Sequence, residues 1–246
     1  MWATRIIARR SIGFASRPPL FSTASTTTPE FTLTRCTSNP HITHLTMSRP
    51  ASRNALGNQM MEEFSRHLDS LNSCPSTRCV ILSSSVERVF SAGADLKERK
   101  VMSPIQAGQF VSHLRSSFTS LANLPMPVIA VVEGAALGGG LEIALCADFI
   151  IAGEGSSFGL PETGLGIIPG AGGTQRLPRL IGTAKSKELM FTGRRIKGEE
   201  AHTIGIAAYL EVSERSEAKR SEAKRSEASK SQIVYVLLAR FSRSQP

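Results

Sequence analysis

The chain has 246 residues, of which 41% are hydrophobic and 20% are charged, a composition typical of a globular protein with a sizeable core. Its net charge of +9 lies mainly at the two ends, with +4 in residues 1–29, +3 in residues 211–246 and only +2 between them. No stretch reaches the roughly 20 apolar residues of a membrane-spanning helix. The composition therefore argues against a membrane span and gives little support to a nucleic-acid partner.

The first 29 residues contain four Arg, many Ser and Thr, and no acidic residue. Arg5, Arg9 and Arg10 can share one face of a helix, with apolar residues on the opposite face. This pattern predicts a mitochondrial transit peptide, and hence a location in the mitochondrial matrix. A disordered basic tail is the alternative, but such tails rarely carry an apolar counter-face.

Strand and helix patterns alternate through the middle of the chain. Helical spacing of apolar residues, such as Met60, Phe64 and Leu68, contrasts with short, continuously apolar runs that are typical of buried strands. This alternation predicts crossover connections, a mostly parallel sheet and an α/β fold with repeated ββα-like turns. The expected strands are 41–48, 78–85, 127–134 and 149–153, and the expected helices are 58–72, 104–123 and one that opens at the glycines 138–140.

The character of the sequence changes from residue 211, and SERSEAKRSEAKRSEASKS, residues 213–231, repeats SEAKR with Ala as its only apolar residue. Such a segment cannot bury enough apolar surface to offset the entropy of ordering, so 211–246 is predicted to be a low-complexity tail, disordered or at most a solvated helix. The apolar run Ile233 to Phe241 is too short to cross a membrane. The folded part is expected to end near Leu210.

Three glycines follow a predicted buried strand in VEGAALGGGLEIALCAD, residues 132–148. They allow close approach of another group, and they leave unpaired N–H groups at the start of the next helix, where an oxygen with developing negative charge can bind. Glu142 lies in the first turn of that helix among apolar residues, so its carboxylate needs a partner or a cavity. Tight packing alone explains the glycines equally well.

Two further segments carry candidate groups. SAGAD, residues 91–95, exposes the backbone N–H of Ala94 at a strand-to-helix corner, although Asp95 could simply cap the following helix. Two converging N–H groups would form an oxyanion hole. Glu162 follows Pro161 in a loop of glycines and apolar residues, a setting that favours contact with a pocket and a raised pKa.

Together, SAGADLKE, GAALGGGLEIALCAD, PETGLGIIPGAGGTQRLPR and FTGRRI resemble the crotonase (enoyl-CoA hydratase/isomerase) superfamily, including its mitochondrial hydratases. The resemblance covers residues 38–210 through several motifs in the same order, which is more specific than any one glycine pattern. It implies a spiral of ββα units, with a C-terminal helical segment that assembles trimers or hexamers.

The resemblance also implies roles for individual residues. The N–H groups of Ala94 and Gly139 would bind the thioester oxygen of an acyl-coenzyme A substrate, and Glu142 and Glu162 would flank a catalytic water. The residues implied in binding the coenzyme A and acyl portions are Arg53, Ala55, Leu56, Ala92, Asp95, Leu96, Gly138, Pro161, Gly164 and Leu165.

Retention of both acids favours hydration of an α,β-unsaturated acyl-CoA in fatty-acid or branched-chain acyl-CoA metabolism. Glu142 would activate water and Glu162 would protonate the α-carbon, and this order of roles comes from the resemblance. The chemistry needs an acid, a base and an oxyanion site, with no cofactor and no metal, and the four cysteines show no metal-ligand spacing. An enoyl-CoA isomerase, which manages with the acid at the position of Glu162, is the alternative enzyme.

The SEAKR repeats stand where the family continues with its trimer-forming helices, so that segment is expected to be missing or replaced. A truncated, inactive family member is therefore a further reading. An RNA-binding module is the third, but helix 58–72 carries Glu62, Glu63 and Asp69 against a single Arg66, which is no phosphate-binding stripe.

Overall fold

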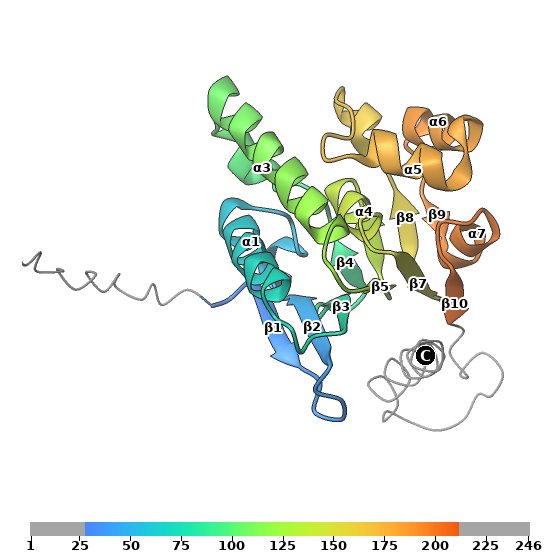
Figure 1. Cartoon of the computed structure of the whole chain (residues 1–246). Coiled ribbons are helices and arrows are strands. Elements are labelled where there is room, and N and C mark those ends of the chain that lie inside the picture. Colours follow the sequence, from blue (N-terminus) through green and yellow to red (C-terminus); the bar gives the residue numbers. More distant parts are fainter. Residues whose placement is uncertain (1–27, 212–246) are drawn as a thin grey trace, which may run out of the picture.

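The computed structural model describes residues 28–211. Nearly all of the predicted transit peptide and of the predicted low-complexity tail lies outside these residues. The chain forms two β-sheets and a layer of helices, and Figure 1 shows their arrangement.

The larger sheet has six strands in the order β1-β2-β3-β5-β7-β10. Only the pairing of β1 with β2 is antiparallel, and the other neighbours run parallel. The mostly parallel sheet predicted from the sequence is therefore confirmed. Its strands are β1 Phe31–Arg35, β2 Ile42–Met47, β3 Cys79–Ser84, β5 Val128–Val132, β7 Phe149–Gly153 and β10 Tyr209–Glu211.

The smaller sheet has four short strands in the order β4-β6-β8-β9. β4, β6 and β8 are parallel, and β9 is antiparallel to β8. The strands are β4 Val89–Ser91, β6 Ala135–Leu137, β8 Ser157–Gly159 and β9 Ile196–Lys197.

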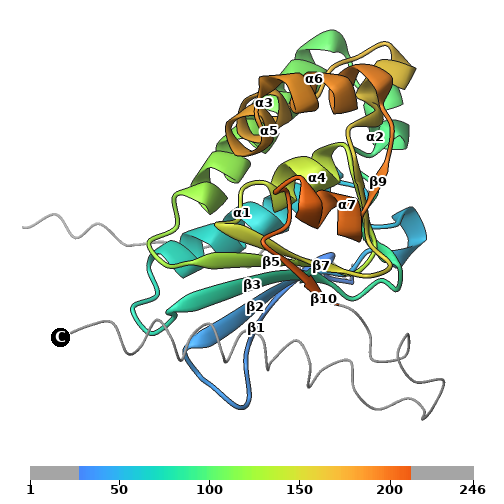
Figure 2. The ribbon, with the colours of Figure 1, turned by 90° about the vertical axis from the view of Figure 1, so that its right-hand side faces the viewer.

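The helices lie on one side of the larger sheet, which Figure 2 shows edge-on below them. The α-helices are α1 Asn58–Asn72, α2 Leu96–Lys100, α3 Pro104–Ala122, α4 Gly139–Ala144, α5 Gly173–Ile181, α6 Thr183–Thr192 and α7 Gly198–Thr203, and the 3-10 helices are η1 Pro50–Ser52 and η2 Pro161–Leu165.

A repeated unit connects the two sheets. The chain passes from a strand of the larger sheet to a strand of the smaller one and then to a helix, as β3–β4–α2, as β5–β6–α4 and as β7–β8–η2. This is the ββα spiral that the sequence resemblance implies, and it is confirmed. Because each unit ends in a strand-to-helix corner, successive corners lie side by side where the smaller sheet meets the helices.

Sequence patterns located the long elements and missed the short ones. Helix 58–72 is present with those bounds, and the strands expected at 41–48, 78–85 and 127–134 are each shorter by two or three residues. No strand was predicted at β1, at β10 or at any strand of the smaller sheet, and no helix at α5, α6 or α7. Strands of two or three residues are too short to show a period.

The main core lies between the larger sheet and the helices. Phe64 of α1 stacks on Phe31 of β1 at 5.0 Å between ring centroids and meets Phe118 of α3 edge-on at 6.4 Å. Burial of each ring contributes about 2–3 kcal/mol, so these contacts hold β1 and α3 against α1. A second group of buried side chains lies on the opposite face of the sheet, which explains why β3 and β5 are apolar at consecutive positions.

Polar contacts secure the start of β1. Glu63 of α1 accepts hydrogen bonds from the backbone N–H groups of Glu30 at 2.7 Å and Phe31 at 2.8 Å. Although sequence analysis placed Glu63 on an acidic surface face of α1, its side chain is buried and structural. The N–H groups that it pairs belong to a strand the sequence analysis did not predict.

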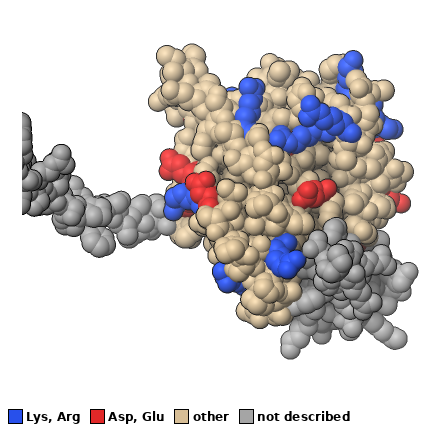
Figure 3. All heavy atoms as spheres, in the orientation of Figure 1, with Lys and Arg blue, Asp and Glu red and all other residues tan. Residues whose placement is uncertain are grey.

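The surface carries charges of both signs. On the face drawn in Figure 3, Lys, Arg, Asp and Glu side chains are separated by wide uncharged areas, with more cations in the upper part. Between residues 28 and 211, the helices are all too short or too polar to cross a bilayer.

Candidate functional site

A pocket opens where three strand-to-helix corners meet under α3. Its walls come from the loop before α2, the start of α4, η2 and the loop that leads into α5. These are the corners produced by successive ββα units, so the fold itself brings together residues that are far apart in the sequence, such as Ala92 and Ala171.

Two backbone N–H groups lie close together at the pocket. A Cβ atom built on Gly139 would lie 3.6 Å from the nitrogen of Ala94, so the two segments nearly touch. Gly139 is the first residue of α4, and its N–H therefore has no partner inside the helix. Within residues 28–211, neither N–H donates to another protein group. The pair is free to donate to one external oxygen.

The glycine triplet has two separate structural roles. Gly138 adopts φ +53°, a conformation that side chains with a Cβ rarely adopt, and a Cβ there would lie 3.0 Å from Glu162 Oε1. A Cβ on Gly140 would overlap the carbonyl oxygen of Ser91. Close packing and access to the pocket, which were alternatives in the sequence, both occur, at different glycines.

Glu142 lies one turn into α4 and is 2% exposed. Its Oε1 accepts hydrogen bonds from the N–H of Ala171 at 2.8 Å and of Gly173 at 2.7 Å. Burial is the largest influence and raises the pKa of the Glu142 carboxyl, and these N–H donors offset only part of the rise. Gly173 begins α5, so the carboxylate lies at a helix N-terminus, which favours its ionised form.

Glu162 is also buried but has fewer hydrogen-bond donors. It lies in η2 directly after Pro161, is 8% exposed, and its Oε2 is buried without a hydrogen-bond partner among the described residues. Burial raises the pKa of the Glu162 carboxyl to about 7, and the charge of Glu142 acts in the same direction. Near neutral pH, Glu162 therefore holds a proton in a large fraction of molecules, as its apolar sequence setting predicts.

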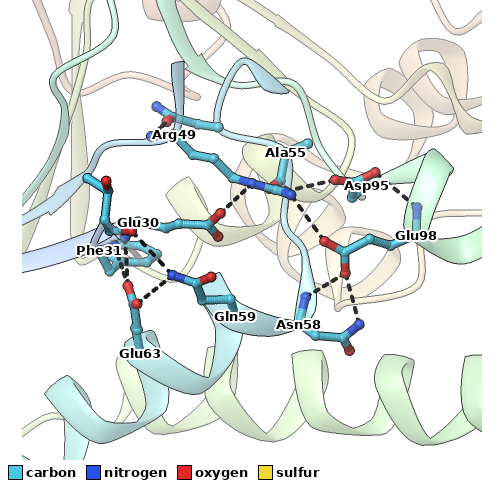
Figure 4. A network of polar contacts seen from close by, with 11 residues as sticks. Glu30, Phe31, Arg49, Ala55, Asn58, Gln59, Glu63, Asp95 and Glu98 are labelled. Atoms are coloured by element: carbon cyan, nitrogen blue, oxygen red, sulfur yellow. Dashed lines mark hydrogen bonds and ion pairs between the residues drawn. The ribbon is translucent and has the colours of Figure 1, made fainter. Parts of the chain in front are cut away.

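An ion-pair cluster fixes the loop that presents Ala94. Arg49 contacts Glu30 at 2.7 Å, Asp95 at 2.8 Å and Glu98 at 3.1 Å, and it donates to the carbonyl of Ala55 at 2.8 Å, as Figure 4 shows. Asp95 also caps α2 by accepting the N–H groups of residues 97 and 98. We call Arg49, Glu30, Asp95 and Glu98 the Arg49 cluster.

Backbone pairing adds to this support. The N–H of Leu56 donates to the carbonyl of Gly93 at 2.7 Å, and the N–H of Asp95 donates to the carbonyl of Leu56 at 3.1 Å. The segment around Leu56 and the SAGAD segment, which the resemblance places on the same ligand, are thus adjacent.

The structure brings ten of the fourteen predicted site residues into the pocket wall. These are Leu56, Ala92, Ala94, Leu96, Gly138, Gly139, Glu142, Pro161, Glu162 and Leu165.

Four predicted site residues do not line the pocket. The Asp95 carboxylate forms an ion pair with Arg49, and the carbonyl of Ala55 accepts a hydrogen bond from the same guanidinium. Arg53 is exposed after η1, and Gly164 is exposed on the outer side of η2. The pocket wall includes sequence neighbours of Ala55, Asp95 and Gly164, namely Leu56, Ala94, Leu96 and Leu165, but neither neighbour of Arg53.

Sequence analysis missed part of the pocket wall. The additional lining residues had no signal in the sequence beyond being apolar or small, except for one charged residue, Arg99. The additional lining residues are Gly93, Arg99, Val111, Leu114, Ile167, Ile168, Gly170 and Ala171. Among residues 28–211, no three His, Cys, Asp or Glu side chains come together as a metal-binding group.

Comparisons with known proteins agree with this geometry. Residues 37–242 match the family model described as enoyl-CoA hydratase/isomerase. The chain is 48% identical over 186 residues to the Mus musculus protein named enoyl-CoA hydratase domain-containing protein 2, mitochondrial, covering 75% of this chain and 63% of that protein. It is 45% identical over 181 residues to methylglutaconyl-CoA hydratase, mitochondrial, of the same species, covering 73% and 58%.

A solved structure has the same fold. The crystal structure of enoyl-CoA hydratase from Bacillus anthracis superposes with a TM-score of 0.72 at 44% sequence identity, covering 77% of this chain and 73% of that one. The chain spans about three fifths of the length of the curated relatives it matches.

Proposed function

Because this chain belongs to the enoyl-CoA hydratase/isomerase family, we propose that it hydrates an α,β-unsaturated acyl-CoA thioester. The observation that carries the proposal is the contrast between two buried carboxyl groups in one pocket. Glu142 accepts two N–H bonds, and Glu162 has an oxygen without a partner among residues 28–211 and a pKa raised to about 7. One group suits a base and the other an acid.

The N–H groups of Ala94 and Gly139 bind the thioester oxygen. Hydration places negative charge on this oxygen as the enolate forms, and donors that are already oriented stabilise that charge without reorganisation. Such a donor typically contributes about a hundredfold or more to the rate. The Arg49 cluster, together with the pairing between Leu56 and the SAGAD segment, holds the Ala94 donor in place.

Glu142 removes a proton from water as the water oxygen bonds to the β-carbon, and Glu162 delivers its proton to the α-carbon. The double bond is consumed, no electrons are transferred, and one water is incorporated. At the end Glu142 carries the proton and Glu162 is ionised, so a proton must return from Glu142 to Glu162 before the next cycle. Their electrostatic coupling in one pocket supports this return. No step passes through a metal or a redox cofactor.

We place this reaction in mitochondrial acyl-CoA metabolism, of fatty or branched-chain acids. The N-terminal sequence has transit-peptide character, and similar proteins carry mitochondrial names.

The direct test is hydration of crotonyl-CoA by the full chain, followed as loss of absorbance of the conjugated thioester. Glu142→Gln and Glu162→Gln each keep the size of the side chain and remove its acid–base chemistry, so each is expected to lower kcat by about a hundredfold or more. Glu154→Gln is the matched control, because Glu154 is exposed and does not line the pocket.

Three outcomes would contradict the proposal. Equal activity of the wild type and both pocket variants would remove the two carboxyl groups from the mechanism. Conversion of a 3-enoyl-CoA to the 2-enoyl isomer, without hydration, would assign an isomerase that depends on Glu162. A wild-type chain that only aggregates in size-exclusion chromatography and has no activity would identify an inactive family member.

A further inference from the structure

We propose that Arg99 makes this pocket selective for acyl groups that end in a second carboxylate. The inference rests on the proposed function, because it places an acyl-CoA in the same pocket. It concerns the one positively charged side chain among the described residues of the pocket wall, which no catalytic step uses.

Arg99 reaches the pocket because of its position on α2. Leu96 and Arg99 are three residues apart, so they share one face of this helix, and both line the pocket. Lys97 and Lys100 have the same spacing on another face, and neither lines the pocket. The helix follows directly after Ala94, so Arg99 lies about one helical turn beyond the proposed thioester-binding N–H.

The charge of Arg99 is not neutralised within the described part of the chain. Both acids of the same segment are already engaged, because Asp95 and Glu98 contact Arg49. Glu98 also accepts the N–H of Asn58 at 2.8 Å through its other oxygen. Within residues 28–211 the Arg99 guanidinium has neither an ion pair nor a side-chain hydrogen bond.

The surroundings of Arg99 increase the effect of its charge. Its neighbours in the pocket wall include Leu96, Val111, Leu114 and Ile168. An unpaired guanidinium beside apolar side chains gains most from an anion that arrives with the ligand, because water competes less for the contact. An uncharged acyl chain would instead leave the guanidinium without a partner at the edge of an apolar wall.

Two parts of an acyl-CoA carry negative charge, the phosphates of the coenzyme and a carboxylate on the acyl chain. The position of Arg99 among the apolar residues of the pocket wall favours the acyl chain. Paired ligands that differ only in the terminal group separate these two sources, because every acyl-CoA has the same phosphates.

The experiment measures equilibrium binding of glutaryl-CoA and pentanoyl-CoA to the full chain by calorimetry. These saturated ligands have the same chain length and cannot be hydrated, so the readout does not need catalysis. Arg99→Gln is expected to weaken glutaryl-CoA binding by about tenfold or more and to leave pentanoyl-CoA binding unchanged. Arg99→Lys should recover part of the loss, and Lys100→Gln, on the other face of α2, should have no effect.

Equal weakening of both ligands by Arg99→Gln would assign Arg99 to the coenzyme phosphates and overturn the proposal, as would equal binding by the wild type and the variant. For turnover, the paired substrates are glutaconyl-CoA and 2-pentenoyl-CoA, and the loss in kcat/KM should be confined to glutaconyl-CoA. If the wild type hydrates neither substrate but still shows the binding difference, the proposed function fails and the assignment of Arg99 stands.

Discussion

The Arg49 cluster, whose carboxyl groups are buried or partly buried, differs from the pocket in how those groups are paired. In the cluster, Glu30, Asp95 and Glu98 all contact one guanidinium, and only one oxygen, Oε2 of Glu30, lacks a partner among residues 28–211. In the pocket, Glu142 has two backbone donors. Glu162 has an unpaired oxygen and no positively charged side chain in contact among residues 28–211.

This difference separates structural acids from acids available for chemistry. Burial alone would raise the pKa of Asp95, but hydrogen bonds from the N–H of residue 98 and from Arg49 lower it overall, so this carboxyl group positions a loop and does not supply a proton near neutral pH. A carboxyl group that is buried without a cation can supply a proton near neutral pH, and its ionised form lowers the stability of the fold. The Arg49 cluster positions the loop of Ala94 and so supports the pocket from outside.

Removal of the guanidinium should have the largest effect on stability. Arg49→Met leaves three carboxylates close together without a cation, and the expected loss in the free energy of unfolding is about 3–5 kcal/mol. Chemical denaturation monitored by circular dichroism measures this loss. Arg194→Met is the control, because its pairs with Glu188 and Glu200 are exposed, and a loss as large there would mean that burial does not distinguish the cluster.

Glu162→Gln should increase the free energy of unfolding rather than lower it, and the increase should depend on pH. The pKa of Glu162 is raised from its ordinary 4.5 to about 7 in the folded chain, so the folded state is favoured by protonation and loses stability as pH rises from about 4.5 to 7. At pH 8 the variant should be more stable than the wild type by up to about 3 kcal/mol.

The gain from Glu162→Gln should disappear near pH 4.5. Melting temperatures of the wild type and the variant at both pH values measure it, with Glu154→Gln as the exposed control. A gain that is the same at both pH values would show that Glu162 is not destabilised by its charge.

The hydration rate should show the same titration. Glu162 must be protonated to deliver its proton, so kcat should fall above pH 7 by about tenfold per unit, while protonation of Glu142 should lower it at acid pH. Initial rates on crotonyl-CoA from pH 5 to 9 measure both limbs. A rate that stays constant from pH 7 to 9 would remove Glu162 from the role of acid.

Glu142→Gln should have the smallest effect on stability, although its effect on rate is large. The amide oxygen can still accept the N–H groups of Ala171 and Gly173, and the weaker neutral hydrogen bonds are partly offset by the loss of a buried charge. We expect a change in the free energy of unfolding of about 1 kcal/mol or less. A much larger loss in urea denaturation would show that Glu142 serves the fold as the Arg49 cluster does.

Local patterns determined much of this fold. The apolar spacing in residues 58–72 predicted α1 with its bounds, and the continuously apolar runs predicted β3 and β5, because the period of buried side chains is a property of neighbouring residues. β1 and β10 were missed, since their sequences contain no continuous apolar run and they become strands only by pairing with β2 and β7. The strands of the smaller sheet were also not predicted, because two or three residues are too few to show a pattern and pairing decides their conformation.

The sequence by itself determined the class of fold, the family and the two carboxyl groups of the pocket. Glycines beside Glu142 and an apolar loop around Glu162 are local signals, and the order of the motifs is read along the chain. Only the tertiary structure decided which acids are neutralised, because Arg49 meets Asp95 across 46 positions of sequence. It also decided that Arg99 faces the pocket while Asp95 does not, since side-chain direction and ion pairing depend on neighbours that are distant in the chain.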